Sequence, residues 1–256
     1  MPKEEKPKEP FLKPINPKYK YTLVLDLDET LVHYISDEEL DNNSAYIQIR
    51  PGAEDFIKDL SEFYEIIIFT AAQQNYADLV IDALDPDKVI SYRLYRQHTI
   101  YFENVNIKDL DKLGRDLKQV IIIDNSKENY SFQPKNGLNI ADFEGNEYDE
   151  ELEYLKDYLI KLIKKNPDDV RYYLKDIQIS MDNRAVFFKK IYEQNNNKKE
   201  FLNNNCSNKN LFSEIINSDN ININEEEKIV QKYSDRYIHK GYSYTKESQN
   251  FEDDKS

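Results

Sequence analysis

The stretch "LVLDLDETLV", residues 23–32, ends an apolar run with three acidic residues, Asp26, Asp28 and Glu29. The aliphatic residues before them are typical of a buried strand. Burying an unpaired carboxylate costs on the order of several kcal/mol. Two interpretations are therefore open at this point. Either the strand ends at the surface and water solvates the acids, or a cation lies against them.

The same apolar pattern occurs three times along the chain. The runs are "YTLVLDLD" (21–28), "YEIIIFT" (64–70) and "QVIIIDN" (119–125), each short and apolar on both faces. This pattern is typical of a parallel sheet that helices cover on both sides. We therefore predict an open α/β fold with right-handed crossovers, in which ligands bind beyond the carboxyl ends of the strands.

Two amphipathic segments between these runs predict covering helices over residues 52–63 and 74–84. Their apolar side chains recur at helical spacing, so each helix should bury one face. The expected buried residues are Phe56, Ile57, Leu60 and Phe63 in the first helix, and Tyr76, Leu79, Val80 and Ala83 in the second.

Polar side chains stand at the ends of all three predicted strands. The first ends in Asp26 and Asp28, the second in Thr70, and the third in Asp124 and Asn125. Each could instead cap a helix or lie in a solvated turn, and for Thr70 alone that alternative is equally good. Parallel strands bring all five residues to one sheet edge, where oxygen ligands suit a hard cation, magnesium first. A cation there would neutralise the acids.

The composition of the chain excludes several classes of protein. The formal net charge of -14 argues against tight non-specific binding to nucleic acid or to anionic lipid. The single cysteine, Cys206, gives neither a disulfide framework nor a zinc-binding pattern. The mean hydropathy of -0.83 is low for a chain that is folded throughout, so unfolded length is expected.

The sequence indicates three regions. Residues 1–17 carry five prolines and many charges, which predicts a disordered leader. Residues 18–193 contain the periodic segments and form the predicted catalytic domain. Residues 194–256 form a predicted low-complexity tail, in which 12 of the 30 residues from 195 to 224 are Asn. A short amphipathic helix is expected over residues 184–194.

No targeting or membrane segment is visible in the sequence. No apolar run approaches the length of a membrane helix. The first ten residues, "MPKEEKPKEP", match neither a secretory signal nor a mitochondrial presequence. We therefore expect a soluble intracellular protein of the nucleus or cytoplasm. The oligomeric state is left open, with a monomer as the expectation.

Six blocks of sequence together resemble a known family of enzymes. They are "LVLDLDETLVH", "RPGAEDFI", "IIIFTAAQQNYAD", "YRQH", "IKDLDKLGRDL" and "IIIDNSKENY". In unbroken order from about Tyr19 to Leu174, they are similar to the small phosphatases that act on the C-terminal domain of RNA polymerase II, and to their nuclear-envelope relatives. "DLDET" resembles the DxDxT motif of the haloacid dehalogenase superfamily, to which these phosphatases belong.

The resemblance implies a fold, an activity and a location. The fold is a Rossmann-like parallel sheet without a large cap domain. The activity is magnesium-dependent hydrolysis of phosphoserine and phosphothreonine in proteins, through an aspartyl-phosphate intermediate. The nucleus is implied by the resemblance only.

The family roles also carry over to matching positions. Asp26 is the implied nucleophile and Asp28 the general acid, then base. Thr70 matches the hydroxyl that holds the phosphoryl group, and Lys108 matches the lysine that neutralises it. A carboxylate nucleophile divides the hydrolysis into two easier steps. Positive charge is needed because two carboxylates would otherwise repel a dianionic phosphate.

The resemblance further implies where magnesium and substrate bind. Magnesium would contact the Asp26 carboxylate, the Asp28 backbone carbonyl and the Asn125 side chain, with Asp124 beside it. The implied substrate-binding residues are Thr30, Tyr76 and Arg96. Ordinary helix packing for Tyr76 and a solvated or paired surface role for Arg96 remain as alternatives. His33 and His98 are expected to be structural or solvated.

One departure from the family concerns substrate choice. Close relatives carry a longer segment before "RPG" that helps to form an apolar pocket for a substrate proline. Here only His33 to Ile49 lies there, most of it polar, and Gln73 stands where relatives are apolar. Proline-directed recognition is therefore in question, while an uncapped site suits a protein loop.

Three functions are compatible with the motif residues to different degrees. The leading hypothesis is a protein phosphatase with a phosphoprotein as its partner and no direct contact with nucleic acid. A small-molecule phosphatase of the same superfamily would usually need a cap domain, for which the sequence leaves no room. A non-catalytic binding module on the same fold should lack catalytic groups, whereas all the motif residues are present here.

Overall fold

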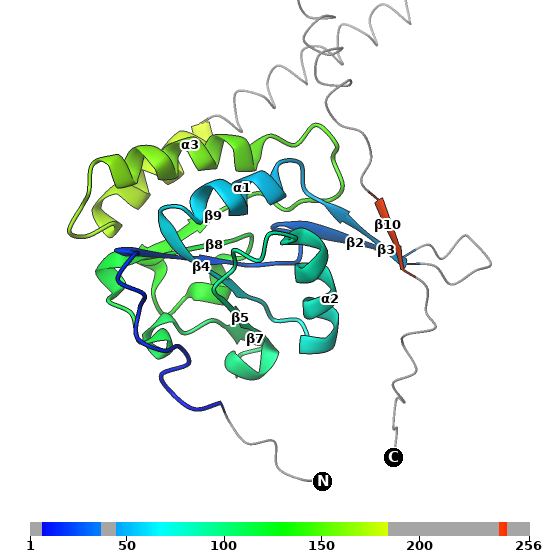
Figure 1. Cartoon of the computed structure of the whole chain (residues 1–256), viewed down its shortest axis with the longest axis horizontal. Helices are drawn as coiled ribbons and strands as arrows, with labels where there is room; N and C mark the ends of the chain where they lie inside the picture. The colour runs from blue at the N-terminus through cyan, green and yellow to red at the C-terminus, as the bar shows by residue number, and fades with distance from the viewer. Residues whose placement is uncertain (1–6, 37–44, 184–240, 245–256) are drawn as a thin grey trace, which may run out of the picture. The chain divides into compact units, whose positions relative to one another are not determined.

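A computed structural model describes residues 7–36, 45–183 and 241–244. In this described part of the chain, the main sheet has five parallel strands in the order β5-β4-β1-β8-β9, with β1 at its centre (Figure 1). The bounds of these strands are β1 (Tyr21–Leu25), β4 (Tyr64–Phe69), β5 (Tyr92–Leu94), β8 (Val120–Asp124) and β9 (Gly137–Asn139). The predicted α/β fold is confirmed.

The three strands predicted from apolar runs are the three central strands of this sheet. Every residue of β1, β4 and β8 is buried, because helices or short helical turns cover both faces. Leu25 of β1 lies opposite Ile68 of β4 and Ile123 of β8. This register brings the carboxyl ends of the three strands level with one another.

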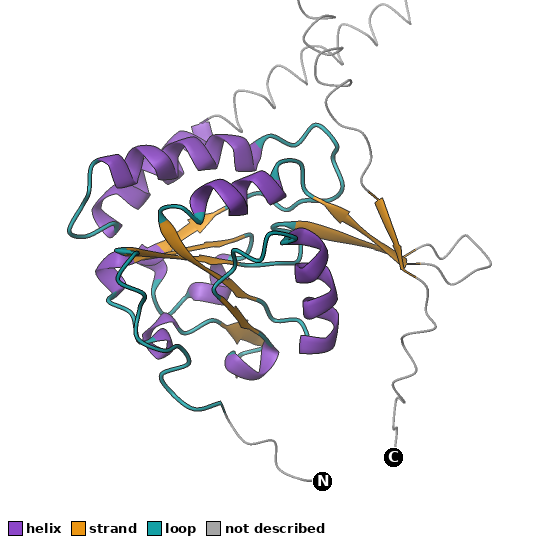
Figure 2. Cartoon of the chain, in the orientation of Figure 1, coloured by secondary structure: helices purple, strands orange, loops and turns teal. Residues whose placement is uncertain are grey.

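Longer helices cover one face of the sheet. The helices α1 (Ala53–Leu60) and α3 (Glu151–Lys164) pack side by side, as Figure 2 shows. Phe56, Ile57 and Leu60 are buried, as predicted, whereas Phe63 is 45% exposed. The expectation for Phe63 was wrong because α1 ends before it, so Phe63 leaves the helical face.

The helix α2 (Gln74–Leu84) connects β4 to β5. Its buried residues are Ala77, Val80, Ile81 and Leu84. The predicted face was partly wrong, since Leu79 is 49% exposed. The buried face of α2 is thus rotated relative to the predicted one. This rotation leaves the Tyr76 side chain free to point toward the end of the sheet.

The other face carries short 3-10 turns and a hairpin in place of long helices. The side chains of Val24, Ile67 and Ile122 on this face pack against Leu110 and Leu113. The turns are η1 (Arg96–His98), η2 (Leu110–Leu113), η3 (Leu117–Gln119), η4 (Lys127–Tyr130) and η5 (Pro134–Asn136), and the hairpin consists of β6 (Ile100–Phe102) and β7 (Val105–Ile107).

A second sheet follows the DxDxT motif. Although this segment was expected to be mostly polar, β2 (Val32–Ser36) and β3 (Ala45–Ile49) pair as an antiparallel hairpin. The strand β10 (Gly241–Tyr244) pairs antiparallel with β3. These four residues belong to the segment predicted to be a low-complexity tail. The rest of that tail, its predicted boundary at residue 194 and the helix expected over 184–194 lie outside the described residues.

The chain divides into two compact units. One consists of Met1–Ile177 with His239–Ser256, and the other of Gln178–Ile238. All the helices, strands and turns named above belong to the first unit. In the described residues, no helix has both the length and the apolar character needed to cross a bilayer.

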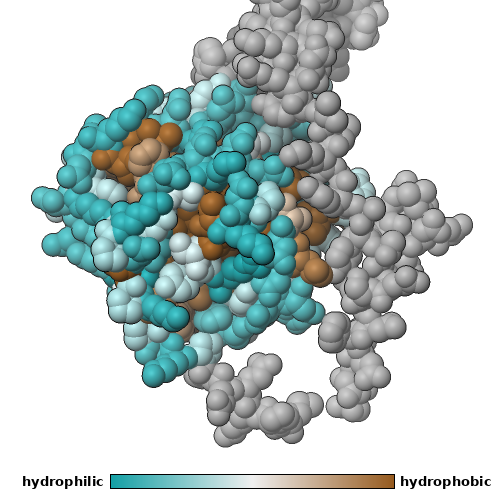
Figure 3. Space-filling model, in the orientation of Figure 1, coloured by the Kyte–Doolittle hydropathy of each residue, from teal (hydrophilic) through white to brown (hydrophobic). Residues whose placement is uncertain are grey.

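Hydrophobic residues are mostly internal to the described domain. On the face that Figure 3 shows, they gather in small patches that hydrophilic residues separate. The aliphatic side chains of β1, β4 and β8 lie beneath this surface, with no exposed area for most of them. The described part of this face is therefore mainly polar, as the composition leads one to expect.

Residues 9–12 pack against the domain, so the prediction of a disordered leader was wrong for them. Leu12 is 4% exposed and joins the hydrophobic cluster on the 3-10 face of the sheet. The Phe11 amide donates to the Lys112 carbonyl at 2.8 Å. Gly114, with φ +69°, has no Cβ, and a Cβ there would lie 2.7 Å from Pro10 Cβ. The segment therefore fits closely against this turn.

We predict that Leu12→Ala lowers the free energy of unfolding by about 2–5 kcal/mol, because it opens a cavity in the core. Leu79→Ala, which truncates an exposed leucine of α2, is the matched control and should change it by less than about 0.5 kcal/mol. Urea denaturation of the full chain measures both. Equal effects of the two substitutions would show that the N-terminal segment adds nothing to the core.

Candidate active site

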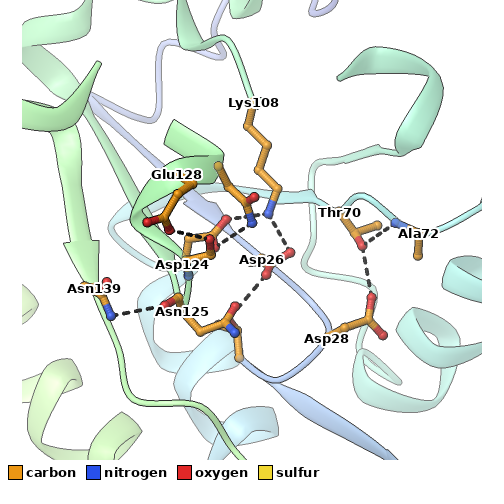
Figure 4. A network of polar contacts seen from close by, with 12 residues as sticks. Asp26, Asp28, Thr70, Ala72, Lys108, Asp124, Asn125, Glu128 and Asn139 are labelled. Carbon is orange, nitrogen blue, oxygen red and sulfur yellow. Dashed lines mark hydrogen bonds and ion pairs between the residues drawn. The ribbon is translucent and has the colours of Figure 1, made fainter. Parts of the chain in front are cut away.

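The structure brings the predicted strand-end residues together at one edge of the sheet (Figure 4). Asp26 directly follows β1, and its amide donates to the Ile123 carbonyl of β8 at 3.0 Å. Asp124 is the last residue of β8, and Thr70 directly follows β4. The acids of two neighbouring strands therefore share one site, as the parallel topology predicts.

Lys108 is the centre of this site. Its ammonium lies 2.6 Å from Asp26 Oδ1 and 2.5 Å from Asp124 Oδ2. The Lys108 side chain has no exposed area, and its backbone amide donates to the Asn129 carbonyl at 2.6 Å. Lys108 follows β7, so the hairpin on the 3-10 face places this cation against two strands of the sheet.

Asp124 is fully engaged by its neighbours. While Oδ2 contacts Lys108, Oδ1 accepts hydrogen bonds from the Ser126 amide at 2.9 Å and from Asn129 Nδ2 at 3.0 Å. The Asp124 side chain has no exposed area. These bonds favour a role in holding Lys108 and the turn after β8. A place for Asp124 beside the metal remains a prediction.

Burial dominates the electrostatics of the site. It raises the pKa of Asp26 to about 7, with Lys108 opposing the rise and Asp124 adding to it. Burial lowers the pKa of Lys108, but the charges of Asp26 and Asp124 outweigh this effect, and the net shift is upward. With both acids ionised, the three groups carry a net charge of -1 because one ammonium faces two carboxylates. A second cation near Asp26 would balance this charge.

The donor groups near Asp26 fit a magnesium ion. Carboxylate, carbonyl and amide oxygens are the ligands that magnesium prefers, and Asp26, the Asp28 backbone and Asn125 supply one of each. Among the described residues, no group of three or more His, Cys, Asp or Glu side chains is arranged to hold a metal. The site would therefore depend on mixed oxygen donors and water.

Thr30 lies between two of these groups. Its hydroxyl is 3.5 Å from Asp26 Oδ2 and 3.3 Å from Asn125 Oδ1, and the residue has no exposed area. Substrate binding was predicted for Thr30. Complete burial instead favours a supporting role, in which the hydroxyl orients the oxygens of Asp26 and Asn125.

Asp28 is held by two hydroxyl groups. Tyr76 donates to Asp28 Oδ1 at 2.8 Å, and Thr70 Oγ1 donates to Oδ2 at 3.2 Å. The Ala72 amide donates to Thr70 Oγ1 at 2.9 Å, which fixes this hydroxyl in place. Burial, and then the Asp28 charge, raise the pKa of Tyr76 well above its usual range. Tyr76 therefore stays protonated as a donor and does more than pack within its helix.

The hairpin of β2 and β3 reaches the same side of the site. The ring of Tyr34 meets the ring of Tyr76 edge-on, with centroids 6.3 Å apart. Tyr34 is 40% exposed. Two aromatic side chains, Tyr34 and Tyr76, thus lie on the Asp28 side of the site, even though the segment between the DxDxT motif and "RPG" is short.

Arg96 lies next to the segment that follows β4. It is exposed, and its Nε donates to the Ala71 carbonyl at 2.6 Å. Because Ala71 follows Thr70, the guanidinium is tied to the strand end that carries the site. Nearby, His98 Nδ1 accepts from the Tyr95 amide, while His33 contacts Glu29 at 2.6 Å. Both histidines have structural partners, as expected.

The sequence interpretation missed three supporting residues, Arg50, Asn129 and Asp142. Arg50 has no exposed area and binds both carboxylate oxygens of Asp149 at 2.8 Å. Arg50 also donates to the Thr30 carbonyl at 3.1 Å. Arg50 lies in the "RPG" block and Asn129 in the "IIIDNSKENY" block. Their positions inside motif blocks were the sequence signal that could have identified them. Asp142 follows β9, a strand that the sequence reading did not identify.

The parallel sheet, with acids at the carboxyl ends of its central strands, defines an α/β protein whose site lies at that edge of the sheet. Residues 21–171 match the sequence profile of the family described as "NLI interacting factor-like phosphatase". The chain belongs to this family. The resemblance proposed from the six motif blocks is thereby confirmed.

Curated relatives carry related names. The chain is 44% identical over 170 residues to "CTD small phosphatase-like protein 2" of Dictyostelium discoideum, covering 61% of this chain and 30% of the relative. It is 40% identical over 176 residues to "Probable C-terminal domain small phosphatase" of the same organism, covering 63% and 57%. It is 34% identical over 186 residues to "Mitochondrial import inner membrane translocase subunit TIM50" of Candida glabrata, covering 72% and 36%. The chain thus spans 30% to 57% of the length of these relatives.

We predict that, in EDTA, wild-type stability falls as the pH rises from about 4 to about 7. The pKa of Asp26 is 3.8 in ordinary surroundings and about 7 in the folded protein. Within this window the folded state retains a proton that the unfolded state has already released. Raising the pH removes that proton from the folded state, and stability is lost.

The Asp26→Asn variant has no such proton to lose, so its free energy of unfolding should decline less over this window. Asp157→Asn, at an exposed position of α3, is the matched control. Urea denaturation at about pH 5 and about pH 8 makes the comparison. Parallel declines in the wild type and Asp26→Asn would show that Asp26 is ionised throughout.

Proposed function

We propose that the chain is a magnesium-dependent phosphatase for phosphoserine and phosphothreonine in proteins, acting through an aspartyl-phosphate on Asp26. The observation that carries the proposal is the contact of Lys108 with Asp26 at the end of the central strand. A nucleophilic carboxylate needs positive charge close by, both to stay ionised and to approach a phosphate dianion. Membership of a family of phosphatases supports the same reaction.

The first step follows from the placement of the two motif aspartates. A carboxylate oxygen of Asp26 attacks phosphorus, and the bond between phosphorus and the serine oxygen breaks. Asp28 gives its proton to the departing serine oxygen, a transfer typically worth about 10²–10⁴-fold in rate. The Tyr76 and Thr70 hydroxyls orient the Asp28 carboxyl for this transfer.

The second step returns the enzyme to its starting state. Asp28, now a carboxylate, takes a proton from a water molecule whose oxygen attacks the phosphorus of the aspartyl-phosphate. The acyl phosphate bond breaks, inorganic phosphate leaves, and Asp26 is free again. Lys108 keeps its charge beside Asp26 throughout, while Asp124 holds the ammonium in position.

Magnesium, when bound by Asp26, the Asp28 carbonyl and Asn125, would supply the positive charge that lets a phosphate dianion approach the acids. The charge balance of the buried groups supports this, since two carboxylates face one ammonium. Removing the metal should therefore abolish turnover.

The exposed surroundings of the site favour a protein substrate. Tyr34, which contacts Tyr76, and Arg96, which contacts Ala71, are both exposed. Arg96 would bind a second phosphate or an acidic side chain next to the phosphoserine. The relatives named for C-terminal-domain phosphatases suggest polymerase-like phosphopeptides as the first to test. Location in the nucleus or cytoplasm, and a monomeric state, remain predictions.

A binding module on the same fold is the second candidate. One relative is named as a mitochondrial translocase subunit rather than as a phosphatase. A module of this kind would bind a phosphopeptide without hydrolysing it. The complete set of Asp26, Asp28, Thr70 and Lys108 at one strand edge favours the enzyme, because binding alone does not require a nucleophile and an acid. A small-molecule phosphatase is disfavoured since the described residues form no large cap over the site.

We predict magnesium-dependent release of phosphate from phosphoserine peptides by the full chain. Excess EDTA and the Asp26→Asn substitution should each reduce the rate by at least about 10³-fold, because both remove groups of the first step. Asp157→Asn is the control and should keep the wild-type rate. Acid quenching with a ³²P-labelled substrate should leave label on the protein that hydroxylamine releases. Binding of the peptide without hydrolysis would favour the module instead.

We predict that Arg96→Ala raises the KM for a doubly phosphorylated peptide by about tenfold, through loss of a charge-assisted contact. The KM for an aryl phosphate should change little, because a small substrate does not reach the loop. Arg171→Ala, which removes an arginine paired with Asp169, is the control. Equal changes for both substrates would remove the assigned role of Arg96.

A further inference from the structure

Asp142 is an exposed acid outside the sequence motifs, and it contacts a proposed metal ligand directly. Asn125 Nδ2 donates to Asp142 Oδ1 at 2.8 Å. On the other side of the amide, the Thr30 hydroxyl lies 3.3 Å from Asn125 Oδ1. The two ends of the Asn125 amide therefore have different partners.

Hydrogen bonds hold the residues on both sides of Asp142 in place. The Ala141 carbonyl accepts from Arg50 Nη1 at 3.0 Å, and the Phe143 amide donates to the Glu29 carbonyl at 2.7 Å. Phe143 is fully buried. Asp142 is thus held against the DxDxT loop rather than at the tip of a free surface segment.

The backbone of Asn125 is tied to the same region. Asn139 Nδ2, at the end of β9, donates to the Asn125 carbonyl at 3.2 Å (Figure 4). With the backbone fixed in this way, the remaining freedom of Asn125 is the orientation of its side-chain amide. That orientation decides whether an oxygen or an NH₂ group faces Asp26.

We propose that Asp142 is a positioning residue that sets the orientation of the Asn125 amide for magnesium. An ionised carboxylate only accepts hydrogen bonds, so it selects the NH₂ end of the amide. The oxygen end is then turned toward Thr30 and the Asp26 side of the site. A cation needs that oxygen, and it would be repelled by the NH₂ end.

This inference rests on the proposed function, in which Asn125 is a magnesium ligand. It adds a group that acts through the ligand, as outer-shell partners of metal sites do. Without Asp142, the amide would have no strong acceptor for its NH₂ group and would lose its preference between the two orientations. Part of the binding free energy of the metal would then be lost in orienting the amide.

The test compares three substitutions in the full chain. Asp142→Ala removes the acceptor, Asp142→Asn keeps an acceptor oxygen but adds an NH₂ donor that can bind the other end of the Asn125 amide, and Glu144→Ala removes an exposed acid two residues further along the same loop. Mn²⁺ serves as the probe because its ligand preference resembles that of magnesium and its free ion is detected by electron paramagnetic resonance. Circular dichroism establishes that each variant is folded.

We expect Asp142→Ala and Asp142→Asn each to weaken Mn²⁺ binding by about 10–100-fold, while Glu144→Ala stays close to the wild type. The magnesium concentration for half-maximal hydrolysis should rise in Asp142→Ala, with kcat recovered at saturating metal. Unchanged Mn²⁺ binding in Asp142→Ala would overturn the inference. Equal weakening in Glu144→Ala would also overturn it, since loss of negative charge from this loop would then be responsible.

The outcomes separate this inference from the proposed function. If the wild type binds Mn²⁺ but hydrolyses no phosphopeptide, the proposed phosphatase activity is contradicted. The role of Asp142 is then decided by comparing Mn²⁺ binding among the variants. A wild type that binds no Mn²⁺ would contradict both. Hydrolysis with normal metal binding in Asp142→Ala would contradict the inference alone.

Discussion

The buried ammonium of Lys108 between the carboxylates of Asp26 and Asp124 is the constraint on which the rest of the site depends. Each of these charges would be costly to bury without the others. The three groups come from the ends of β7, β1 and β8, so their contact requires the hairpin on the 3-10 face to meet two strands of the parallel sheet. A fold that failed to make this contact would leave charge unpaired in its interior.

The charges of this cluster do not balance, because it has more carboxylates than ammonium groups. This imbalance is what suits the cluster to its proposed function. One ammonium cannot neutralise two carboxylates, and burial, with the Asp124 charge adding and Lys108 opposing, raises the pKa of Asp26 to about 7. A core selected only for stability would replace such a group. The proposed function gives a reason to keep it, because a site that receives a cation and transfers a phosphoryl group can use an acid whose charge becomes fully favourable only when a second cation is present.

The surroundings of the cluster divide into a rigid part and an accessible part. Arg50 joins the DxDxT loop to the loop of residues 141–149 through buried bonds, and thereby supports both Thr30 and Asp142. Tyr34 and Arg96, in contrast, remain accessible at the rim. In the proposed phosphatase, the reacting groups are thus the fixed ones, and the groups proposed to contact a peptide are the accessible ones.

The sequence by itself determined the parallel sheet and the convergence at its edge. Runs apolar on both faces have few alternatives to central parallel strands, and the acids at their ends must then meet. Helix faces were harder to predict, as Leu79 and Phe63 show. Periodicity reports that a helix has an apolar side but does not report where the helix ends or how it rotates against the sheet.

Only the tertiary structure decided the contacts between distant segments. Leu12 was assigned to a disordered leader because prolines and charges surround it, and a single buried leucine gives no periodic signal. Asp142 lies in a loop without a motif, and its contact with Asn125 exists because Arg50 and Phe143 fix that loop against the first strand end. Local sequence fixes which groups a strand presents, while their partners depend on packing among residues far apart in the chain.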